Sequence, residues 1–469
     1  MKVDRPNFVF INTDQQRYDT LGCNGSRVGR TPNIDRLAAE GVRFDRCYTT
    51  NPVCMPARAS YFTGQYPSHH GVWQNGVPLN PKADLLHVRL KDAGYHAALI
   101  GKIHLDNVWL RKETHPDYGF DLLTECEGDP YCKDAYFQWL DRQGLYDAYM
   151  EQFKREGHKR GYTRALPEDK HMNNWIAGHV EDYLKQRAGD GRPFFLSVGF
   201  FDPHHPFDPC EPYASMFKPE DMPMPLYRAG EEQAMTPLAR QRFDAISGLC
   251  RDPAQIRGTI AAYHATVSHV DAMVGRLMKA LAATGLEGNT VIIFTSDHGE
   301  MLGDHGILHK GPLFYEGAVR VPLVYRFPLR LGVRGVDAGF ASHADLAPTV
   351  AALAGVEGPK LAQGRALFDR DLRLRPEPAP GAALVEWREK AFQSNDPFLV
   401  ARCLITEQWK YVYYHDRDFG ELYDRQDDPD EFRNLWGDPA RADVVARMRE
   451  RLWRFVLESE PCPTRTDIF

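Results

Sequence analysis

The stretch NTVIIFTSDHG, residues 289–299, is the most strand-like segment of the chain. Its apolar run stops at Ser-Asp-His-Gly, which is the pattern of a buried parallel strand that ends in a loop. A similar run, NFVFINTD at 7–14, also ends on an aspartate. Ligands of open α/β sheets sit beyond the carboxyl ends of the strands, so we expect Asp14 and Asp297 to share a site.

Helix-like and strand-like segments alternate around these two runs. TPNIDRLAAEG at 31–41 predicts a helix, and 85–102 predicts a helix followed by a strand. PFFLSVGF at 193–200 predicts another buried strand, and apolar residues at helical spacing predict a long helix over 256–285. This alternation predicts an α/β fold with a mainly parallel sheet flanked by helices.

The last part of the chain differs in its residue pattern from the part before it. After a Pro-rich connection, the run FLVARCLITEQWKYVYYHD at 398–416 predicts an antiparallel pair of strands, and a final helix is expected at about 439–458. We therefore predict a catalytic α/β domain over 1–371 and a smaller C-terminal α+β subdomain over 372–469. Residues 106–170 lack clean periodicity and are expected to be an insertion that caps a pocket.

Composition narrows the class of protein. The 469 residues are 43% hydrophobic and carry a formal net charge of -7, so no broad basic surface for nucleic acid or anionic lipid is expected. The N-terminal apolar run is too short for a signal peptide, and no run reaches the roughly 18 apolar residues of a membrane span. We expect a cytoplasmic protein without a disulfide framework, because its nine cysteines are scattered and form no C-x-x-C pair. A homo-oligomer stays open.

Three residues at the two strand ends could bind a metal ion. Asp14, Asp297 and His298 offer two carboxylates and an imidazole, which are ligands for divalent cations. One acidic residue at a strand end is more often a cap or a turn former, but two that converge in one sheet favour a metal site. The second Asp-His-Gly, at 304–306, does not follow a strand and is expected to be a turn on a surface loop.

Several cations are expected at the same edge of the sheet. Arg58, Lys102 and Lys310 each follow a predicted element. Singly they would be solvated charges, but together they would form a clamp for an anionic group that gains charge in a transition state. His104 and His204 lie nearby in the sequence and could give or take a proton at neutral pH.

Cys54 has two possible roles. PARASYFTG at 56–64 predicts a short helix, so Cys54 is expected near a helix N-terminus, where backbone N–H groups attract negative charge. Its position alone fits a buried structural thiol as well as a nucleophile. Asn75 is similarly open, because Asn-Gly is a common turn and its side chain could also contact substrate.

The sequence resembles the sulfatase family. CMPAR, residues 54–58, fits the C-x-P-x-R core of that family's signature, and CMPARASYFTGQYPSHHGV is similar to it over its length. Five further blocks resemble the family in the family's order: TPNIDRLAAEGVRFDRCYTT, LIGKIHL, PHHPF, SDHGEMLGDHGILHKG and ELYDRQDDPDEFRNL. The resemblance spans nearly the whole chain, with 106–170 left uncovered.

The resemblance implies an alkaline-phosphatase-like fold with a smaller C-terminal domain. It implies that a formylglycine-generating enzyme oxidises Cys54 to formylglycine, whose hydrated aldehyde is the nucleophile. The positions that match the family's metal ligands are Asp14, Gln15, Cys54, Asp297 and His298. Those that match its sulfate-holding and leaving-group residues are Arg58, Lys102, His104, His204 and Lys310.

Two positions depart from the commonest family pattern. Gln15 stands where many members have a second aspartate, as in choline-sulfatase and phosphonate-monoester-hydrolase relatives. His298 stands where others have asparagine, and an imidazole ligand shifts the preference toward Mn²⁺. The resemblance therefore implies one divalent ion, Ca²⁺ or Mn²⁺, with Mg²⁺ also possible.

Three functions compete. The first is hydrolysis of a small sulfate ester, releasing inorganic sulfate and an alcohol or phenol. The alternative is a phosphonate monoester or phosphodiester hydrolase that uses the same formylglycine, and a third is an inactive binding homologue. Lys102 and His104 favour the sulfatase, since small hydroxyl residues are expected there in those hydrolases. Choline sulfate, aryl sulfates and small carbohydrate sulfates all stay open as substrates.

Overall fold

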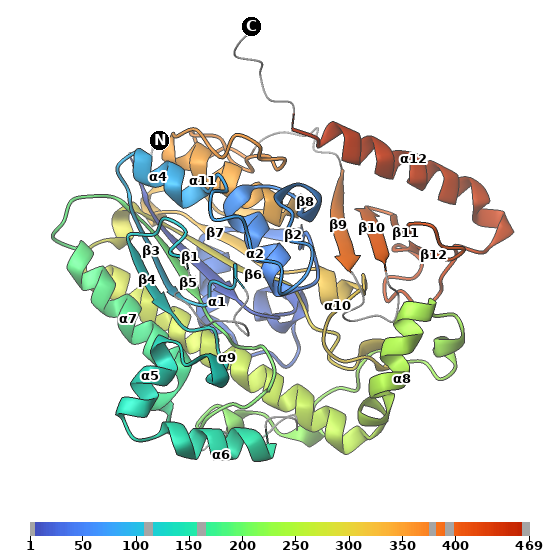
Figure 1. Cartoon of the computed structure of the whole chain (residues 1–469), viewed down its shortest axis with the longest axis horizontal. Helices are drawn as coiled ribbons and strands as arrows, with labels where there is room; N and C mark the ends of the chain where they lie inside the picture. The colour runs from blue at the N-terminus through green and yellow to red at the C-terminus, as the bar shows by residue number, and fades with distance from the viewer. Residues whose placement is uncertain (1–4, 107–115, 157–165, 375–380, 390–397, 462–469) are drawn as a thin grey trace, which may run out of the picture.

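The computed structural model describes residues 5–106, 116–156, 166–374, 381–389 and 398–461. Eight strands form one sheet in the order β4-β3-β5-β1-β6-β7-β2-β8 (Figure 1). The strands are β1 Asn7–Thr13, β2 Val42–Tyr48, β3 His96–Gly101, β4 Leu122–Glu125, β5 Phe194–Gly199, β6 Thr290–Ser296, β7 Leu323–Arg326 and β8 Gly335–Ser342. β7 runs antiparallel to β6 and to β2, and the other pairings are parallel. The predicted mainly parallel sheet is confirmed.

β1 lies near the middle of the sheet and is buried on both faces. Phe8 and Phe10 join the apolar cluster on one face, whereas Val9 and Ile11 join the cluster on the other, since alternate side chains of a strand point to opposite faces. Full burial of each such side chain is worth about 1.5–3 kcal/mol. This two-sided packing holds the end of β1, and therefore Asp14, in place.

Helices cover both faces of the sheet. One face carries α1 Pro32–Glu40, α7 Met172–Arg187 and α9 Pro253–Ala283, and the other carries α2 Cys54–Thr63, α4 Leu86–Asp92 and α11 Leu346–Ala354. The predicted long helix is confirmed as α9, which starts at Pro253 with Asp252 as its N-cap. The predicted short helix is confirmed as α2, and it ends at Gly64 with φ 70°.

A second sheet lies beside the first and is entirely antiparallel, in the order β12-β11-β10-β9. Its strands are β9 Ala382–Glu389, β10 Leu399–Thr406, β11 Trp409–Tyr414 and β12 Gly420–Asp424, and α12 Ala442–Glu458 lies across it (Figure 1). The predicted antiparallel pair is confirmed, and two further strands flank it. The domain ranges 1–371 and 372–469 stay a prediction.

The segment 106–170 is partly described. It supplies edge strand β4, together with α5 Ala135–Arg142 and α6 Tyr146–Glu156. Tyr136 and Phe137 of α5 join the same apolar cluster as α7 and α9. Residues 107–115 and 157–165 lie outside the described part, and a role for this segment as a pocket cap stays a prediction.

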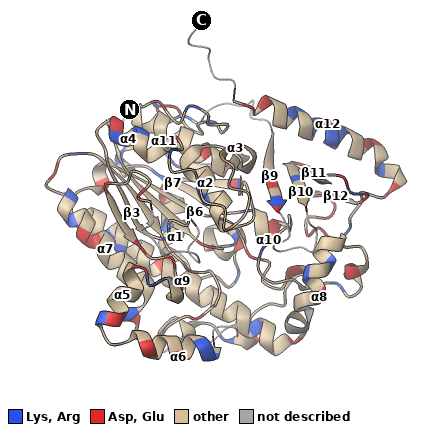
Figure 2. Ribbon diagram, in the orientation of Figure 1, with Lys and Arg blue, Asp and Glu red and all other residues tan. Residues whose placement is uncertain are grey.

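Charged residues are mixed on the outer helices. Lys and Arg alternate with Asp and Glu along helices such as α7 and α12 (Figure 2). Among the described side chains no cysteine forms a disulfide. Within the described segments no helix combines the length and the apolar character that crossing a membrane requires, and the predicted cytoplasmic location stays a prediction.

Candidate active site

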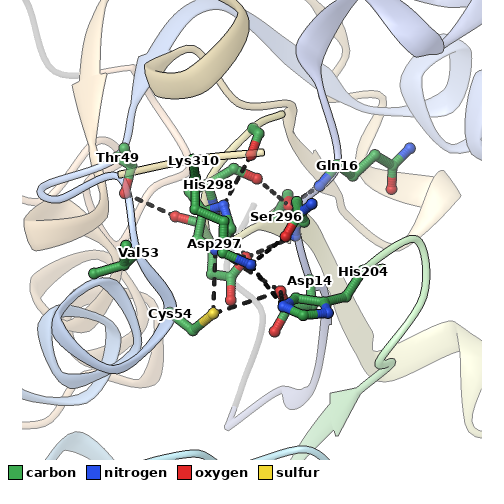
Figure 3. A network of polar contacts seen from close by, with 12 residues as sticks. Asp14, Gln16, Thr49, Val53, Cys54, His204, Ser296, Asp297, His298 and Lys310 are labelled. Atoms are coloured by element: carbon green, nitrogen blue, oxygen red, sulfur yellow. Dashed lines mark hydrogen bonds and ion pairs between the residues drawn. The ribbon is translucent and has the colours of Figure 1, made fainter. Parts of the chain in front are cut away.

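The candidate site lies where the carboxyl ends of β1 and β6 meet the start of α2. Thr13 pairs with Ser296 in the parallel register of these strands, so Asp14 and Asp297 emerge side by side. Ligand atoms of Asp14, Cys54, Asp297 and His298 all lie within 4.8 Å of one another, and all four residues are buried. Figure 3 shows these side chains turned toward one another, together with those of His204 and Lys310.

Cys54 is the first residue of α2 and points into this cluster. Its Sγ lies 3.6 Å from Asp14 Oδ1 and 3.2 Å from His298 Nε2 (Figure 3). Burial and Asp14 would raise the pKa of the thiol, but Lys310, His298 and Lys102 outweigh them and hold that pKa well below its usual range. The surroundings of residue 54 therefore stabilise negative charge, as a nucleophile requires.

Arg58 is one turn further along α2 and ties three strand ends together. Its Nε donates to Asp297 Oδ2 at 2.9 Å and its Nη2 to Asp14 Oδ2 at 3.2 Å. Its Nη1 donates to Asn12 Oδ1 and to the Lys102 carbonyl. All three nitrogens of this guanidinium are thus engaged with the protein, and Arg58 holds the two carboxylates in place through hydrogen bonds.

The two aspartates differ in their electrostatic surroundings. Burial would raise the pKa of Asp14, but Lys102, His204 and Arg58 outweigh it and hold that pKa well below the usual range. Lys102 Nζ lies 2.8 Å from Asp14 Oδ2. Burial and the neighbouring Asp14 instead raise the pKa of Asp297. A metal cation bound between these two carboxylates, in addition to Arg58 and Lys102, would therefore stabilise the ionised form of both.

The donor set fits a divalent metal ion. Two carboxylates and an imidazole are suitable ligands for Ca²⁺, Mg²⁺ or Mn²⁺. His298 Nδ1 lies 2.9 Å from the Gly299 carbonyl oxygen, which can only accept, so this nitrogen carries the proton. The lone pair of His298 Nε2 is then left on the side that faces Asp14 and Cys54.

Gln15 lies beside this set with a strained backbone. Its φ of 69° is unusual for a residue other than glycine. The conformation is held from both sides, because its N–H donates to Asp297 Oδ1 at 2.9 Å and its carbonyl accepts from the Tyr263 hydroxyl at 2.6 Å. The side-chain amide contacts Lys310 and Glu300.

Lys310 and His204 form a pair at the edge of the cluster. Lys310 Nζ lies 2.6 Å from His204 Nε2, and His204 Nδ1 donates to the His205 carbonyl at 2.5 Å. Burial, followed by Lys310, lowers the pKa of His204 to about 4. The imidazole is therefore neutral at pH 7, and because its Nδ1 carries the hydrogen, its Nε2 accepts a hydrogen bond from Lys310.

Close packing of two glycines brings Lys102 to the site. A Cβ on Gly101, where φ is 103°, would lie 2.0 Å from the Gly199 carbonyl oxygen, so no larger residue fits at this paired end of the parallel strands β3 and β5. Lys102 follows directly, and its ammonium also lies 4.8 Å from the Phe201 ring centroid.

Two predicted site residues, His104 and Asn75, have their hydrogen-bond partners outside the cluster. The His104 N–H donates to Glu127 Oε1 at 3.0 Å, and its Nδ1 is buried with no hydrogen-bond partner among the described residues. Asn75 Oδ1 accepts from the Met55 N–H at 3.0 Å, so it supports the first turn of α2. A contact between Asn75 and substrate stays a prediction.

One expectation about a loop is wrong. Residues 304–306 do form a turn, but Asp304 and His305 are buried and not on the surface. Asp304 pairs with Arg17 at 2.8 Å, which satisfies its charge away from water. A paired carboxylate can be buried in a turn, and the local sequence gives no sign of so distant a partner.

Three residues of the site escape sequence reasoning. Asn12 and Tyr263 hold Arg58 and Gln15, respectively, and Glu300 contacts the Gln15 amide. Asn12 does carry a signal, because it is a polar residue inside the apolar run of β1. Glu300 directly follows Ser-Asp-His-Gly, but Tyr263 lies among the apolar residues of α9 and has no local signal.

Two family models and several known proteins are similar to this chain. The model of the Sulfatase family matches residues 6–356, and the model described as N-sulphoglucosamine sulphohydrolase, C-terminal, matches 303–458. The chain is 34% identical to the uncharacterized sulfatase YidJ of Escherichia coli (strain K12), over 96% of this chain and 86% of that protein. It is 30% identical to an arylsulfatase of Clostridium perfringens (strain 13 / Type A), over 92% and 90%.

A solved structure is also similar over the full length. The phosphonate monoester hydrolase of Agrobacterium radiobacter superposes with a TM-score of 0.82 at 27% identity, and the match covers 98% of this chain and 100% of that one. Its fold therefore includes both sheets described above. The chain belongs to the sulfatase family, the sulfuric ester hydrolases of the alkaline-phosphatase-like superfamily.

Proposed function

We propose that this chain hydrolyses sulfate esters of small molecules through a formylglycine derived from Cys54, with the help of one divalent metal ion. The products are inorganic sulfate and an alcohol or phenol. The observation that carries the proposal is the position of Cys54, which starts α2 within the C-x-P-x-R sequence and lies 3.6 Å from Asp14 and 3.2 Å from His298. A formylglycine-generating enzyme is the partner that maturation requires.

Asp14, Asp297 and His298 would hold the ion, together with the Gln15 side-chain oxygen and residue 54. When bound, the ion lowers the pKa of a hydroxyl at position 54 and offsets the charge of the sulfate oxygens. The imidazole of His298 favours Mn²⁺ within this set, whereas the two carboxylates also suit Ca²⁺ and Mg²⁺.

The hydrated aldehyde supplies one hydroxyl to attack sulfur and a second hydroxyl whose deprotonation releases sulfate and restores the aldehyde. We assign Lys102 and Lys310 to offset charge on the sulfate oxygens, because all three nitrogens of Arg58 are engaged with the protein. Lys102 would divide its charge between the sulfate and Asp14. Lys310 also carries the proton that the departing oxygen needs, and neutral His204 orients its ammonium group. A catalytic contact from His104 or Asn75 stays part of the proposal.

The alternative function has specific support. Gln15 and the likeness to the phosphonate monoester hydrolase both favour a phosphonate monoester or phosphodiester hydrolase with the same nucleophile. Lys102 favours the sulfatase, because a small hydroxyl residue is expected at this position in the alternative hydrolases. Its ammonium lies 2.8 Å from Asp14, within the candidate site.

A comparison of substrates tests the proposal. The formylglycine-bearing protein, loaded with Mn²⁺, is assayed with 4-nitrophenyl sulfate, 4-nitrophenyl phenylphosphonate and bis(4-nitrophenyl) phosphate. We expect the largest kcat/KM for the sulfate ester. A larger value for the phosphonate or the phosphodiester would support the alternative. Absence of turnover for all three, with the aldehyde present by mass spectrometry, would support an inactive binding homologue.

A further inference from the structure

The side-chain amide of Gln15 has two ends, and only one of them can bind a cation. An amide oxygen is a metal ligand, whereas an amide NH₂ group repels both a metal ion and an ammonium. The aspartate found at this position in other members has no such ambiguity, since its two oxygens are equivalent. A chain with glutamine here therefore needs something that sets which end of the amide faces the site.

The partners of the amide fix its orientation. Lys310 is an ammonium and can only donate, so the atom it contacts is Oε1 of Gln15. On the other side, Nε2 contacts Glu300 Oε2 and also lies 3.2 Å from His205 Nδ1. The two hydrogens of the NH₂ group thus have one acceptor each, and neither acceptor belongs to the cluster of Asp14, Cys54, Asp297 and His298.

Glu300 is committed to accepting hydrogen bonds. Its side chain is fully buried, and its Oε1 accepts from the backbone N–H groups of Leu302, at 2.9 Å, and of His309. Because two backbone N–H groups occupy Oε1, Oε2 is the oxygen left to accept from the NH₂ end of Gln15.

We propose that Glu300 is a positioning residue that, with His205, holds the Gln15 amide with its oxygen toward Lys310 and the metal-ligand cluster. This inference rests on the proposed function, because it concerns the metal ion that this function requires. His205, Glu300 and His309 also have the chemistry of a metal-ligand set, and their ligand atoms lie within 4.8 Å of one another. The Gln15 nitrogen already contacts His205 and Glu300, so holding the Gln15 amide is the simpler role for this group.

Glu300→Gln should reverse the amide. The single oxygen of the new side chain would be taken by the N–H groups of residues 302 and 309, so its NH₂ group would face Gln15. The Gln15 oxygen would then turn toward residue 300, and its NH₂ group would turn toward Lys310 and the metal. Changes in residues that orient metal ligands typically weaken metal binding about 10- to 100-fold.

A double-mutant cycle with Gln15→Glu tests this directly. Mn²⁺ affinity is measured by competition with a fluorescent chelator for wild type, Glu300→Gln, Gln15→Glu and the double variant. We expect Glu300→Gln to weaken Mn²⁺ binding about 10- to 100-fold when Gln15 is present. In the Gln15→Glu background it should cause no loss, because a carboxylate at position 15 has no wrong orientation and Glu300→Gln there removes a contact between two carboxylates. An equal loss in both backgrounds, or no loss in either, would overturn the proposal.

The controls separate this positioning role from a general effect on folding. Glu386→Gln alters a carboxylate that is equally buried and also accepts a backbone N–H, and it should leave Mn²⁺ affinity unchanged. If Glu300→Gln does not fold, His205→Leu removes the second acceptor of Gln15 in the same cycle, and it too should weaken binding only when Gln15 is present. Metal affinity is measured without substrate, so a wild type that binds Mn²⁺ but turns over no sulfate ester would contradict the proposed function and leave this inference standing.

Discussion

Arg58 Nε donates to Asp297 Oδ2 at 2.9 Å, and both side chains are almost completely shielded from water. The same guanidinium pairs with Asp14 at 3.2 Å, so one cation contacts both carboxylates of the site, and Lys102 adds a second positive charge at Asp14. Removal of one partner from a buried ion pair leaves an uncompensated charge and typically costs about 3–5 kcal/mol.

We therefore expect Arg58→Met to lower the free energy of unfolding of the metal-free protein by about 3–5 kcal/mol. Urea denaturation followed by circular dichroism measures this change. Arg36→Met is a matched control, because the Arg36–Glu40 pair is partly exposed and should contribute at most about 1 kcal/mol. Equal stability of the two variants would mean that Arg58 does not compensate the carboxylates.

Cys54 is expected to act through its aldehyde. In peptide mass spectrometry the mature residue should be about 18 Da lighter than cysteine, as the conversion of thiol to aldehyde requires. Cys54→Ala should retain the fold and lose all turnover. Cys54→Ser keeps one hydroxyl but lacks the second, so it should release at most one equivalent of 4-nitrophenol and then stop. Multiple turnovers by either variant would contradict the formylglycine mechanism.

His298 should set the choice of metal. Its Nε2 faces Asp14 and Cys54, and imidazole suits transition metals better than it suits Ca²⁺. We expect His298→Asn, which supplies an oxygen ligand instead, to lower the ratio of Mn²⁺ to Ca²⁺ affinity. Chelator competition with each metal alone gives both constants. An unchanged ratio would mean that residue 298 does not ligate the ion.

The sequence is most informative where the chain is buried on both faces. Uninterrupted apolar runs predict β1 and β6, and the residues that follow them, Asp14 and Asp297, do lie side by side. A short uninterrupted apolar run that ends in polar residues is typical of a parallel strand buried on both faces. The carboxyl ends of parallel strands meet at one edge of the sheet, which is where ligands bind.

The strands that the sequence does not predict carry charges. β12 has the sequence GELYD, and its two acids argue against burial, yet every residue of it is buried. Glu421 accepts from the Tyr414 hydroxyl of the neighbouring strand, a partner that becomes adjacent only after pairing. The same reasoning applies to Glu300, whose partners come from loops that meet only in the folded chain. Long-range pairing of polar groups has no local signature in the sequence.

Acid should destabilise the protein through buried histidines such as His87. Burial lowers the pKa of His87 to about 4, although its ring donates to the Tyr118 carbonyl at 2.8 Å. An unfolded histidine has a pKa of about 6.5, so between about pH 6.5 and 4 the unfolded chain binds a proton that the folded chain does not. Stability is therefore lost as the pH falls through this window, by roughly 3 kcal/mol for this residue.

His87→Phe keeps a ring that can stack on Phe120 but cannot titrate. Between about pH 6 and 4.5, the slope of unfolding free energy against pH should be about 1.4 kcal/mol per pH unit smaller than in wild type, which corresponds to one proton. Urea denaturation at a series of pH values measures both slopes. The prediction fails if the two slopes coincide.

Lys410 of β11 should couple the second sheet to the loops around the first sheet. Its ammonium is fully buried, pairs with Glu316 at 2.8 Å and with Glu431, and donates to the Phe314 carbonyl at 2.9 Å. Burial would raise the pKa of Glu316, but Lys410 and Arg425 outweigh it and lower that pKa to about 2. Glu316 also pairs with Arg425 and Arg320, whereas the ion pair of Glu431 is with Lys410.

We expect Lys410→Met to lower the free energy of unfolding by about 3–5 kcal/mol, because it leaves the buried Glu431 without its ion-pair partner and Glu316 with fewer cations. The double variant Lys410→Met/Glu431→Gln should recover part of that loss, since it removes one of the uncompensated charges. Arg447→Met is the control, because the Arg447–Asp443 pair is exposed and should contribute little. A Lys410→Met protein as stable as wild type would mean that apolar contacts of β11, such as those of Val412, hold the two sheets together without this ion pair.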